Sequence, residues 1–271
     1  MPALDTTLYD VHNAGGAAIG LTPATVATGD SATVRNFSLT SAAYLEFLAV
    51  QSSGTRQARL TSPLLHDNQT GLTFNFSEQP THFLLPREIG QPVVPSDTIA
   101  VSLDAAATSD SVAALGIYYN ALPGVSARLF SWGDISGIVK SIKAIEVDVV
   151  SSATIGQWSD TVITTTEDQL HARSDYAILG YETNTALAVV AVKGQETGNL
   201  RIGGPGPTST LDTSDYFSRM TDFHGRPHIP VFNADNRKSY YVSVAANTAS
   251  VAAKTTLIVA ELTQQLPQAT G

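Results

Sequence analysis

The chain has 271 residues and a net charge of −9; 43% of its residues are hydrophobic, 14% are charged, and none is cysteine. This hydrophobic fraction supports real cores and excludes a disordered chain, and the length suits two ordinary domains or one large all-β domain. The acidic balance argues against a surface that grips phosphate, so no direct nucleic-acid contact is expected, and the lack of cysteine excludes disulfides and thiolate metal sites.

Residues 1–24 are expected to form an extended N-terminal arm that holds at most one short helix or strand, because Gly15, Gly16, Gly20 and Pro23 interrupt any sustained hydrophobic period. The alternative is simple disorder. No secretion signal is predicted, since this segment lacks a basic start and a continuous apolar run. No stretch of the sequence approaches the roughly eighteen apolar residues of a membrane-spanning helix.

Residues 25–123 are predicted to form a first β unit. Short apolar runs recur at regular intervals and are separated by residues typical of turns. One run alternates strictly, with Ile99, Val101 and Leu103 on the same face. The expected strands cover residues 32–37, 44–50, 72–76, 82–85, 98–103 and 112–119.

Residues 124–144 are predicted to link this unit to the next and to hold one short helix. Asp134 is a candidate N-cap. It precedes four apolar residues at helical spacing, Ile135, Ile138, Val139 and Ile142.

Residues 145–262 are predicted to form a second β unit, followed by a loose tail over residues 263–271. Ile145, Val147 and Val149 alternate with acidic residues, which marks the first strand of the unit. About eight strands, the number in a jelly roll, are expected at residues 145–150, 161–165, 177–181, 187–192, 199–202, 228–232, 240–245 and 255–261. One helical turn is expected within residues 211–220.

Residues 45–63 and 187–205 align without a gap at an offset of 142 residues (187 minus 45). The identical pairs are Leu45/Leu187, Ala49/Ala191, Val50/Val192, Thr55/Thr197, Arg59/Arg201 and Pro63/Pro205. Three later blocks follow in the same order: 92–94 with 230–232, 101–102 with 242–243, and 115–117 with 257–259.

Similar composition alone produces some identities between two strand-rich segments, and that explanation stays open. The shared order of the blocks favours an internal duplication. The predicted fold is therefore all-β, with two tandem jelly-roll-like sandwich or barrel units related by duplication. Superposition of the units is expected to bring Arg59 near Arg201.

His224 and His228 stand four residues apart, a spacing that binds metal when it lies on a helix. Gly225 and Pro227 interrupt such a helix, so a pair of loop residues is expected instead. A metal enzyme of the cupin type, built from two β-barrels, would need a His-x-His pair, which the sequence lacks. The first unit has only two histidines, His66 and His82, and the isolated His12 and His66 are expected at the surface.

No Gly-x-Ser-x-Gly motif is present either. We therefore assign no catalytic, cofactor-binding or metal-binding residue, expect no cofactor, and expect that the protein is not an enzyme.

Two further patterns have competing interpretations. Asn36, Asn68 and Asn75 match the N-glycosylation pattern, but without secretion evidence they are most simply strand and turn residues. Trp132 and Trp158 have rings of the kind that stack on sugars, and equally of the kind that pack in a core or an interface.

Two successive jelly-roll-like units in an acidic, cysteine-free chain without a catalytic cluster resemble the double-jelly-roll major capsid proteins of tailless, often membrane-containing bacteriophages and related viruses. The resemblance covers residues 25–262 and rests on architecture and length, so no residue role is carried over. It implies a virion structural protein, located in the capsid, whose homotrimer forms a pseudo-hexameric capsomer.

The partners that this resemblance implies are further copies of the chain, then lattice neighbours, and beyond them other virion proteins or an internal membrane. Two alternatives stay open. One is a different virion β-protein, such as a decoration, spike or tail component. The other is a carbohydrate-binding β-sandwich module.

Overall fold

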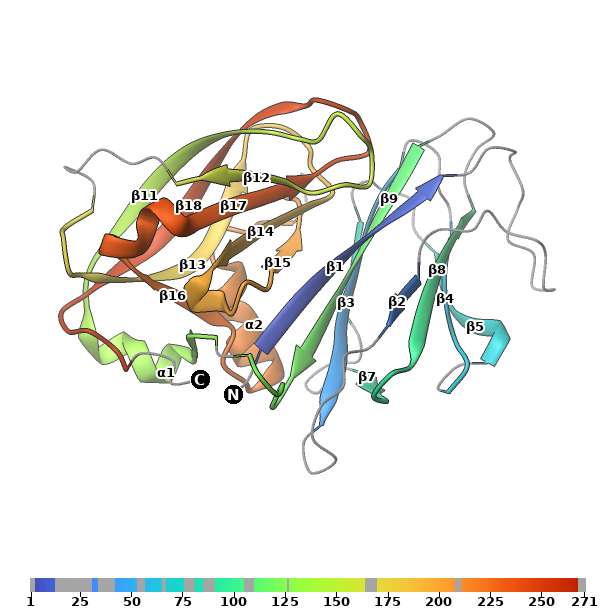
Figure 1. The fold of residues 1–271 in the computed structure, drawn as a ribbon, viewed down its shortest axis with the longest axis horizontal. Helices are drawn as coiled ribbons and strands as arrows, with labels where there is room; N and C mark the ends of the chain where they lie inside the picture. Colours follow the sequence, from blue (N-terminus) through green and yellow to red (C-terminus); the bar gives the residue numbers. More distant parts are fainter. Residues whose placement is uncertain are drawn as a thin grey trace.

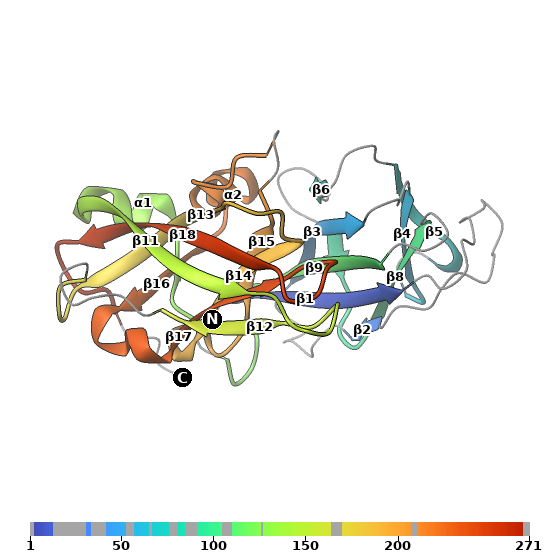
Figure 2. The ribbon, with the colours of Figure 1, turned by 90° about the horizontal axis from the view of Figure 1, so that it is seen from above.

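The computed structural model describes residues 3–12, 31–33, 42–52, 57–64, 67–75, 81–84, 91–104, 110–125, 127–163, 170–207 and 211–267. Within these ranges the chain forms two antiparallel β-sandwiches that lie side by side along the long axis of the molecule (Figure 1). The view from above shows the same arrangement (Figure 2).

The first unit contains the strands of the N-terminal half. One of its sheets has the order β1-β9-β3-β6, with β7 also pairing with β3, and the other has the order β2-β8-β4-β5. Since β6 and β7 pair with successive parts of β3, they share one strand position. The bounds are β1 (Ala3–His12), β2 (Ser31–Thr33), β3 (Ala43–Ser52), β4 (Gln57–Ser62), β5 (Asp67–Asn75), β6 (Thr81–Leu84), β7 (Gln91–Val93), β8 (Thr98–Asp104) and β9 (Asp110–Tyr119).

The second unit has sheets of order β10-β16-β13-β18-β11 and β12-β17-β14-β15. Its strands are β10 (Leu129–Phe130), β11 (Val139–Val150), β12 (Ser159–Val162), β13 (Asp175–Thr183), β14 (Val189–Gly194), β15 (Ile202–Pro205), β16 (Ile229–Asn233), β17 (Tyr240–Ala245) and β18 (Ala252–Leu262). Its helical segments are α1 (Trp132–Ile135), η1 (Ser136–Ile138), η2 (Gln195–Thr197), α2 (Tyr216–His224) and η3 (Ala234–Ser239).

Both units have the same strand connectivity. When the strand positions of each unit are numbered from one to eight, starting at β1 and at β11, the sheet orders are 1-8-3-6 and 2-7-4-5 in both. This is the arrangement of a jelly roll, in which two Greek keys form a double sheet. The all-β, jelly-roll-like fold predicted from the sequence is confirmed, and the two units share one topology.

The alternating patterns locate the cores correctly. Ile145, Val147 and Val149 on β11 are buried, while the acidic residues between them are exposed. Ile99 and Val101 on β8 are likewise buried. Alternate side chains of a strand point to opposite faces, so these residues fill the space between the two sheets of their sandwich.

The register of the longest repeat block is wrong. Residues 45–63 cover β3 and β4, whereas residues 187–205 cover β14 and β15. By sheet position, β4 is equivalent to β14 and β3 to β13. Every hairpin of a sandwich reads as apolar strand, polar turn and second strand, so a local match can fall one hairpin away from the equivalent one.

The consequences of this shift are limited. Arg59 lies on β4 and Arg201 directly precedes β15, so the two are not equivalent. The three shorter blocks do align equivalent strands, namely β7 with β16, β8 with β17, and β9 with β18.

Two segments differ from the sequence-based expectation. Ala3–His12, placed in the N-terminal arm, form strand β1 and pair with β9 along its whole length. The helix α1 starts earlier than expected and is shorter: Ser131 is its N-cap, and Asp134 completes a capping box. Strand β11 starts at Val139, because the alternation of residues 145–150 extends back into the predicted linker. Residues 34–37, 76, 85, 164 and 165 of the expected strands lie outside the described residues.

Candidate functional site

The two jelly rolls meet through unlike sheets. Phe47 and Ala49 on β3 and Ala114 on β9 belong to the first unit, and they form one buried cluster with Val189 on β14 and Ala245 on β17. Strand β15 also lies against β1, β3 and β9, as both views show (Figures 1 and 2). Alanine has little side-chain bulk, so the two sheets approach closely here.

A β-bulge in β3 prepares this contact. Leu45 pairs with Ile117 and Phe47 pairs with Gly116, which leaves Glu46 as the extra residue. A bulge redirects the side chains around it, and here the carboxylate of Glu46 reaches residues of the second unit. Gly116 is required opposite the bulge, because a Cβ atom there would overlap the Phe47 ring.

Glu46 is completely buried and binds two residues of the second unit. Arg226 Nη1 donates to Glu46 Oε1 at 3.1 Å, and His228 Nε2 lies 2.7 Å from Glu46 Oε2. Burying an isolated carboxylate costs free energy, and the two hydrogen-bonding cations or donors offset that cost for Glu46. We call Glu46, Arg226 and His228, with the adjoining His224, the interface cluster.

Aromatic rings of the first unit complete the surroundings of Arg226. Its guanidinium carbon lies 3.9 Å from the centre of the Tyr44 ring and 5.2 Å from that of Tyr118, within the range of cation–π attraction. Burial, reinforced by the Glu46 charge, raises the pKa of Tyr118 well above its usual range, so this phenol stays neutral. The second unit thus inserts one arginine between a carboxylate and two rings of the first.

His224 lies beside the cluster without a polar partner. Its ring stacks on His228 with centroids 5.5 Å apart and meets Phe223 edge-on at 4.9 Å. Neither of its ring nitrogens has a hydrogen-bond partner among the described residues. Burial lowers the pKa of His224 to about 4, so the ring is neutral at neutral pH.

The two histidines that the sequence singled out lie in different elements, although their rings stack. His224 is the last residue of α2, Gly225 caps that helix in the left-handed conformation, and His228 directly precedes β16. They are therefore not two positions of one helix, as the glycine and proline between them predicted. Over the described part of the chain, no group of three or more His, Asp or Glu side chains is arranged to hold a metal ion.

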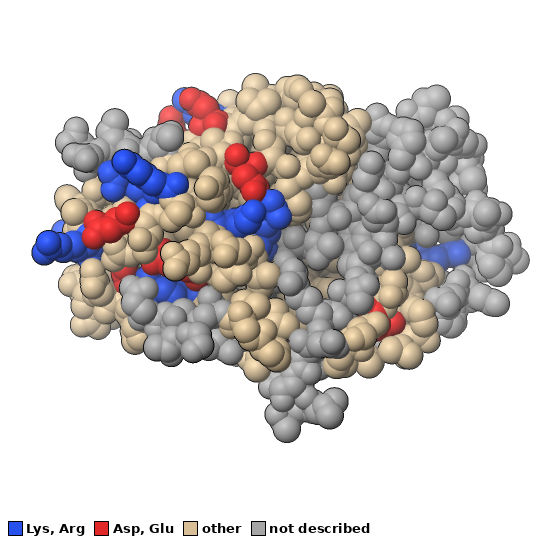
Figure 3. Space-filling view, viewed as in Figure 1, with Lys and Arg blue, Asp and Glu red and all other residues tan. Residues whose placement is uncertain are grey.

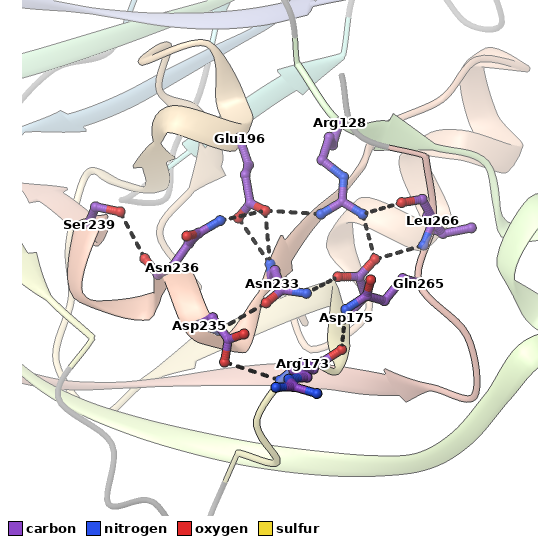
Figure 4. A network of polar contacts seen from close by, with 10 residues as sticks. All are labelled: Arg128, Arg173, Asp175, Glu196, Asn233, Asp235, Asn236, Ser239, Gln265 and Leu266. Atoms are coloured by element: carbon purple, nitrogen blue, oxygen red, sulfur yellow. Dashed lines mark hydrogen bonds and ion pairs between the residues drawn. The ribbon is translucent and has the colours of Figure 1, made fainter. Parts of the chain in front are cut away.

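A second buried network lies inside the second unit (Figure 4). Arg128 Nη2 is 2.5 Å from Asp175 Oδ2, and Arg128 Nη1 is 3.0 Å from Glu196 Oε1. Asn233 donates its amide to Asp175 at 2.8 Å and its backbone N–H to Glu196. Burial raises the pKa of Glu196. We call Arg128, Asp175, Glu196 and Asn233 the internal network.

The internal network also fixes part of the C-terminal segment. The backbone of Leu266 donates to Asp175 at 2.8 Å and accepts from Arg128 at 3.1 Å. Residues 263–267 were expected in a loose tail, whereas Leu266 is held by two buried charges. Such bonding is invisible in the polar sequence of the tail, because the partners lie far away in the chain.

Both tryptophans act as packing residues. Trp158 lies against the apolar contact between the units, and the guanidinium carbon of Arg201 is 5.0 Å from the centre of its ring. Arg201 is held by Asp160, with oxygens at 2.9 and 3.0 Å. Trp132 packs against the main core. These contacts favour the packing interpretation over the sugar-stacking one.

The other residues singled out in the sequence lie away from these clusters. By backbone position, His12 is on β1, His82 is on β6, and Asn68 and Asn75 are on β5. Asn36 and His66 fall outside the described residues. On the face shown in Figure 3, basic and acidic side chains of the described residues lie beside one another. None of the helices described is both long enough and apolar enough to cross a membrane.

Sequence reasoning missed Glu46 and Arg226. A usable signal existed for Glu46, which is the only charged residue in the otherwise apolar run 43–50. A charge within such a run is either exposed at an edge or buried with a partner. Nothing in the local sequence of Arg226 indicates that it is the partner.

No family model and no curated protein matches the chain. Among solved structures, a chain of the T=1 Penaeus vannamei nodavirus is 10% identical and matches with a TM-score of 0.26, covering 97% of this chain and 99% of that one. The major capsid protein P2 of bacteriophage PM2 is 11% identical, with a TM-score of 0.22 and coverages of 97% and 98%.

PNGase F, a glycosylasparaginase from Flavobacterium meningosepticum, is similar to the same degree. It is 11% identical, with a TM-score of 0.21 and coverage of 97% of both chains. Viral proteins and an enzyme match this chain with similarly low TM-scores, so these similarities do not indicate a function.

Proposed function

We propose that the chain is a virion structural protein, a major capsid protein that assembles as a homotrimeric, pseudo-hexameric capsomer. The observation that supports the proposal is the pairing of two jelly rolls of identical connectivity, packed side by side in one chain. In this proposal the protein is not an enzyme, needs no cofactor, and resides in the capsid. Its partners are copies of itself, lattice neighbours, and other virion proteins or an internal membrane.

The geometry of the contact between the units supports ring formation. The sheet containing β3 and β9 of the first unit faces the sheet containing β14 and β17 of the second. These are different sheets of equivalent folds, so the contact is heterologous, and a heterologous contact can be repeated from unit to unit. Three chains joined by similar contacts would close a ring of six jelly rolls.

The surfaces left for such joints are the two outer sheets. In the first unit this is the sheet β2-β8-β4-β5, and in the second it is the sheet that ends at the edge strand β11. On β11, Ile142 is 55% exposed and Val150 is 49% exposed. Apolar side chains on an otherwise charged strand suit a surface that a neighbouring chain covers.

Light scattering on the purified chain tests the trimer. The expected mass is three times that of the 28.5 kDa chain at micromolar concentration and moderate salt. Ile142→Arg should reduce the trimer to monomers by placing a charge in the joint. The control is Val94→Arg, at an exposed apolar residue that directly follows β7 of the inner sheet, which should leave the trimer intact.

A stable monomer of the unmodified chain would overturn the proposal. Electron microscopy of the concentrated protein then separates a capsid protein from another virion protein. Particles formed by the chain alone support a major capsid protein. Binding only to particles made of a different protein would point instead to a decoration, spike or tail component.

A further inference from the structure

The polar part of the contact between the jelly rolls depends on protonation. Both ring nitrogens of His228 lie next to acceptors: Nδ1 is 2.9 Å from the Arg226 carbonyl oxygen and Nε2 is 2.7 Å from the Glu46 carboxylate. The carboxylate of Glu46 is thus shared between His228 and Arg226.

Burial, His228 and Arg226 together lower the pKa of His224 by more than the charge of Glu46 raises it. Both oxygens of Glu46 are already engaged by Arg226 and His228. The titratable and charged groups around the cluster come from both units. The first unit contributes Tyr44 and Glu46 on β3 and Tyr118 on β9. The second contributes Tyr216 and His224 on α2, and Arg226 and His228 in the segment that follows. The tyrosines among them supply no negative charge at neutral or acidic pH.

Separating the two units would relieve this charge more easily than unfolding either of them. Each jelly roll has its own pair of sheets. One apolar cluster of the contact, formed by Phe47, Ala49, Ala114, Val189 and Ala245, is rich in alanine. Once the units part, the side of the cluster that the first unit covers regains water, which lowers the burial cost of the added proton.

We infer that the interface cluster is an acid-operated latch, which holds the two jelly rolls together at neutral pH and releases them when His224 is protonated. The device acts on the arrangement of the two units within one chain. It requires no particular oligomer, so it stands apart from the capsid proposal.

The direction and range follow from linkage. The pKa of His224 is lowered from 6.5 to about 4 in the closed form, so the open form binds more protons between these values. Here the closed form has the two units in contact and the open form has them apart. The free-energy preference for the closed form is complete above pH 6.5 and decreases as the pH falls from 6.5 through about 4. If His224 regains its ordinary pKa on opening, the ratio of closed to open forms falls about 30-fold after allowance for solvent screening.

Trp158 provides the readout, because it lies against the apolar contact between the units. Changing the other tryptophan, Trp132→Phe, leaves Trp158 as the single emitter. In this background we expect the emission of Trp158 to shift to longer wavelength as the pH falls from 6.5 to 4. The far-ultraviolet circular dichroism of the β-sheets should stay unchanged over that range.

Two histidine variants identify the trigger. His224→Phe keeps an aromatic ring and removes the titration, so the emission midpoint should move down by at least about one pH unit. His171→Phe is the matched control, because His171 binds Glu261 and lies outside the contact between the units. It should leave the midpoint in place.

Two results would overturn the latch. One is an emission shift that occurs only together with loss of the circular dichroism signal, which would mean unfolding. The other is an unchanged midpoint in His224→Phe. If that variant fails to fold, His224→Gln replaces it, and the same two outcomes decide.

Discussion

The interface cluster and the internal network are both buried and ionic, yet they are built on opposite charge balances. The internal network gives Arg128 two carboxylates, Asp175 and Glu196, and spreads the excess negative charge over amide donors. The interface cluster gives one carboxylate, Glu46, to Arg226 and to a histidine. The first therefore has more carboxylates than cations, whereas the second has a single carboxylate and two histidines beside its arginine.

Location explains why the two clusters differ in consequence. The internal network holds together five segments of one jelly roll (Figure 4). They are the residue before β10, strand β13, η2, strand β16 and the C-terminal residues. Breaking the network therefore disrupts that fold. The interface cluster joins two folds that each possess their own sheets. Loss of the internal network should appear as lost global stability, whereas loss of the interface cluster should appear mainly as lost coupling between the units.

The largest effect is expected when the internal network loses its cation. Arg128→Met leaves two carboxylates buried without a counter-charge, which should lower the free energy of unfolding by about 4 kcal/mol. Urea denaturation followed by circular dichroism measures it. The control, Arg219→Met, removes an exposed partner of Asp215 and should cost under about 0.5 kcal/mol. Equal losses in the two variants would contradict the proposed importance of burial.

Removing the carboxylate of the interface cluster should have a smaller effect. Glu46→Gln weakens two charge-assisted hydrogen bonds, and the expected loss is about 2 kcal/mol. Water can partly replace the lost partner, since the side chain of Arg226 is 12% exposed. The urea transition should split in two as the units uncouple. Gln51→Ala, which deletes a neutral bond across the contact to the Asn247 backbone, should cost only about 1 kcal/mol.

Acid should act on the two clusters in opposite directions. The pKa of His224 is lowered, so its contribution to stability is lost as the pH falls from 6.5 towards 4, by about 2 kcal/mol after allowance for solvent screening. The pKa of Glu196 is raised, so protonation near and above pH 4.5 favours the folded form.

Stability measured from pH 6.5 to 4.5 distinguishes these contributions. His224→Phe should flatten the acid-induced loss, whereas Glu196→Gln should steepen it, because the compensating gain disappears. Both variants shifting the profile in the same direction would refute the contrast.

The smallest effect is expected at an exposed ion pair that belongs to neither cluster. Lys254 lies 3.1 Å from Glu146 on neighbouring strands, with both side chains largely exposed. Lys254→Met should leave the midpoint of urea denaturation unchanged within error, at low and at high salt. A larger change, measured by the same denaturation, would mean that burial is not what separates the two buried clusters from surface pairs.

The sequence located the strands of the second unit well, because their alternation is strong. Residues 145–150 expose acids between buried valines and an isoleucine, so β11 was recognisable, although it begins earlier at Val139. In the first unit, β1 was missed. Its apolar residues alternate with polar ones only weakly, and its pairing with β9 joins residues about a hundred positions apart in the chain.

The candidate site was mostly beyond sequence reasoning. The pair His224 and His228 attracted attention for its spacing, and Gly225 correctly predicted the break between them. Their partner Glu46 lies 182 residues from His228 in the chain, so no local pattern connects the two. The register of the repeat failed for a related reason, since local similarity cannot distinguish one sandwich hairpin from the next.

The amino-acid sequence by itself determined that the chain is all-β and has two successive units, because side-chain alternation and turn residues act over a few positions and need no distant partner. Tertiary structure alone decided which strands are equivalent, because sheet order arises from pairing between distant segments such as β3 with β9 and β13 with β18. Tertiary structure also decided that Glu46 is buried. The β-bulge at Glu46 directs its carboxylate towards the second jelly roll, and Arg226 of that unit supplies the charge that stabilises it there.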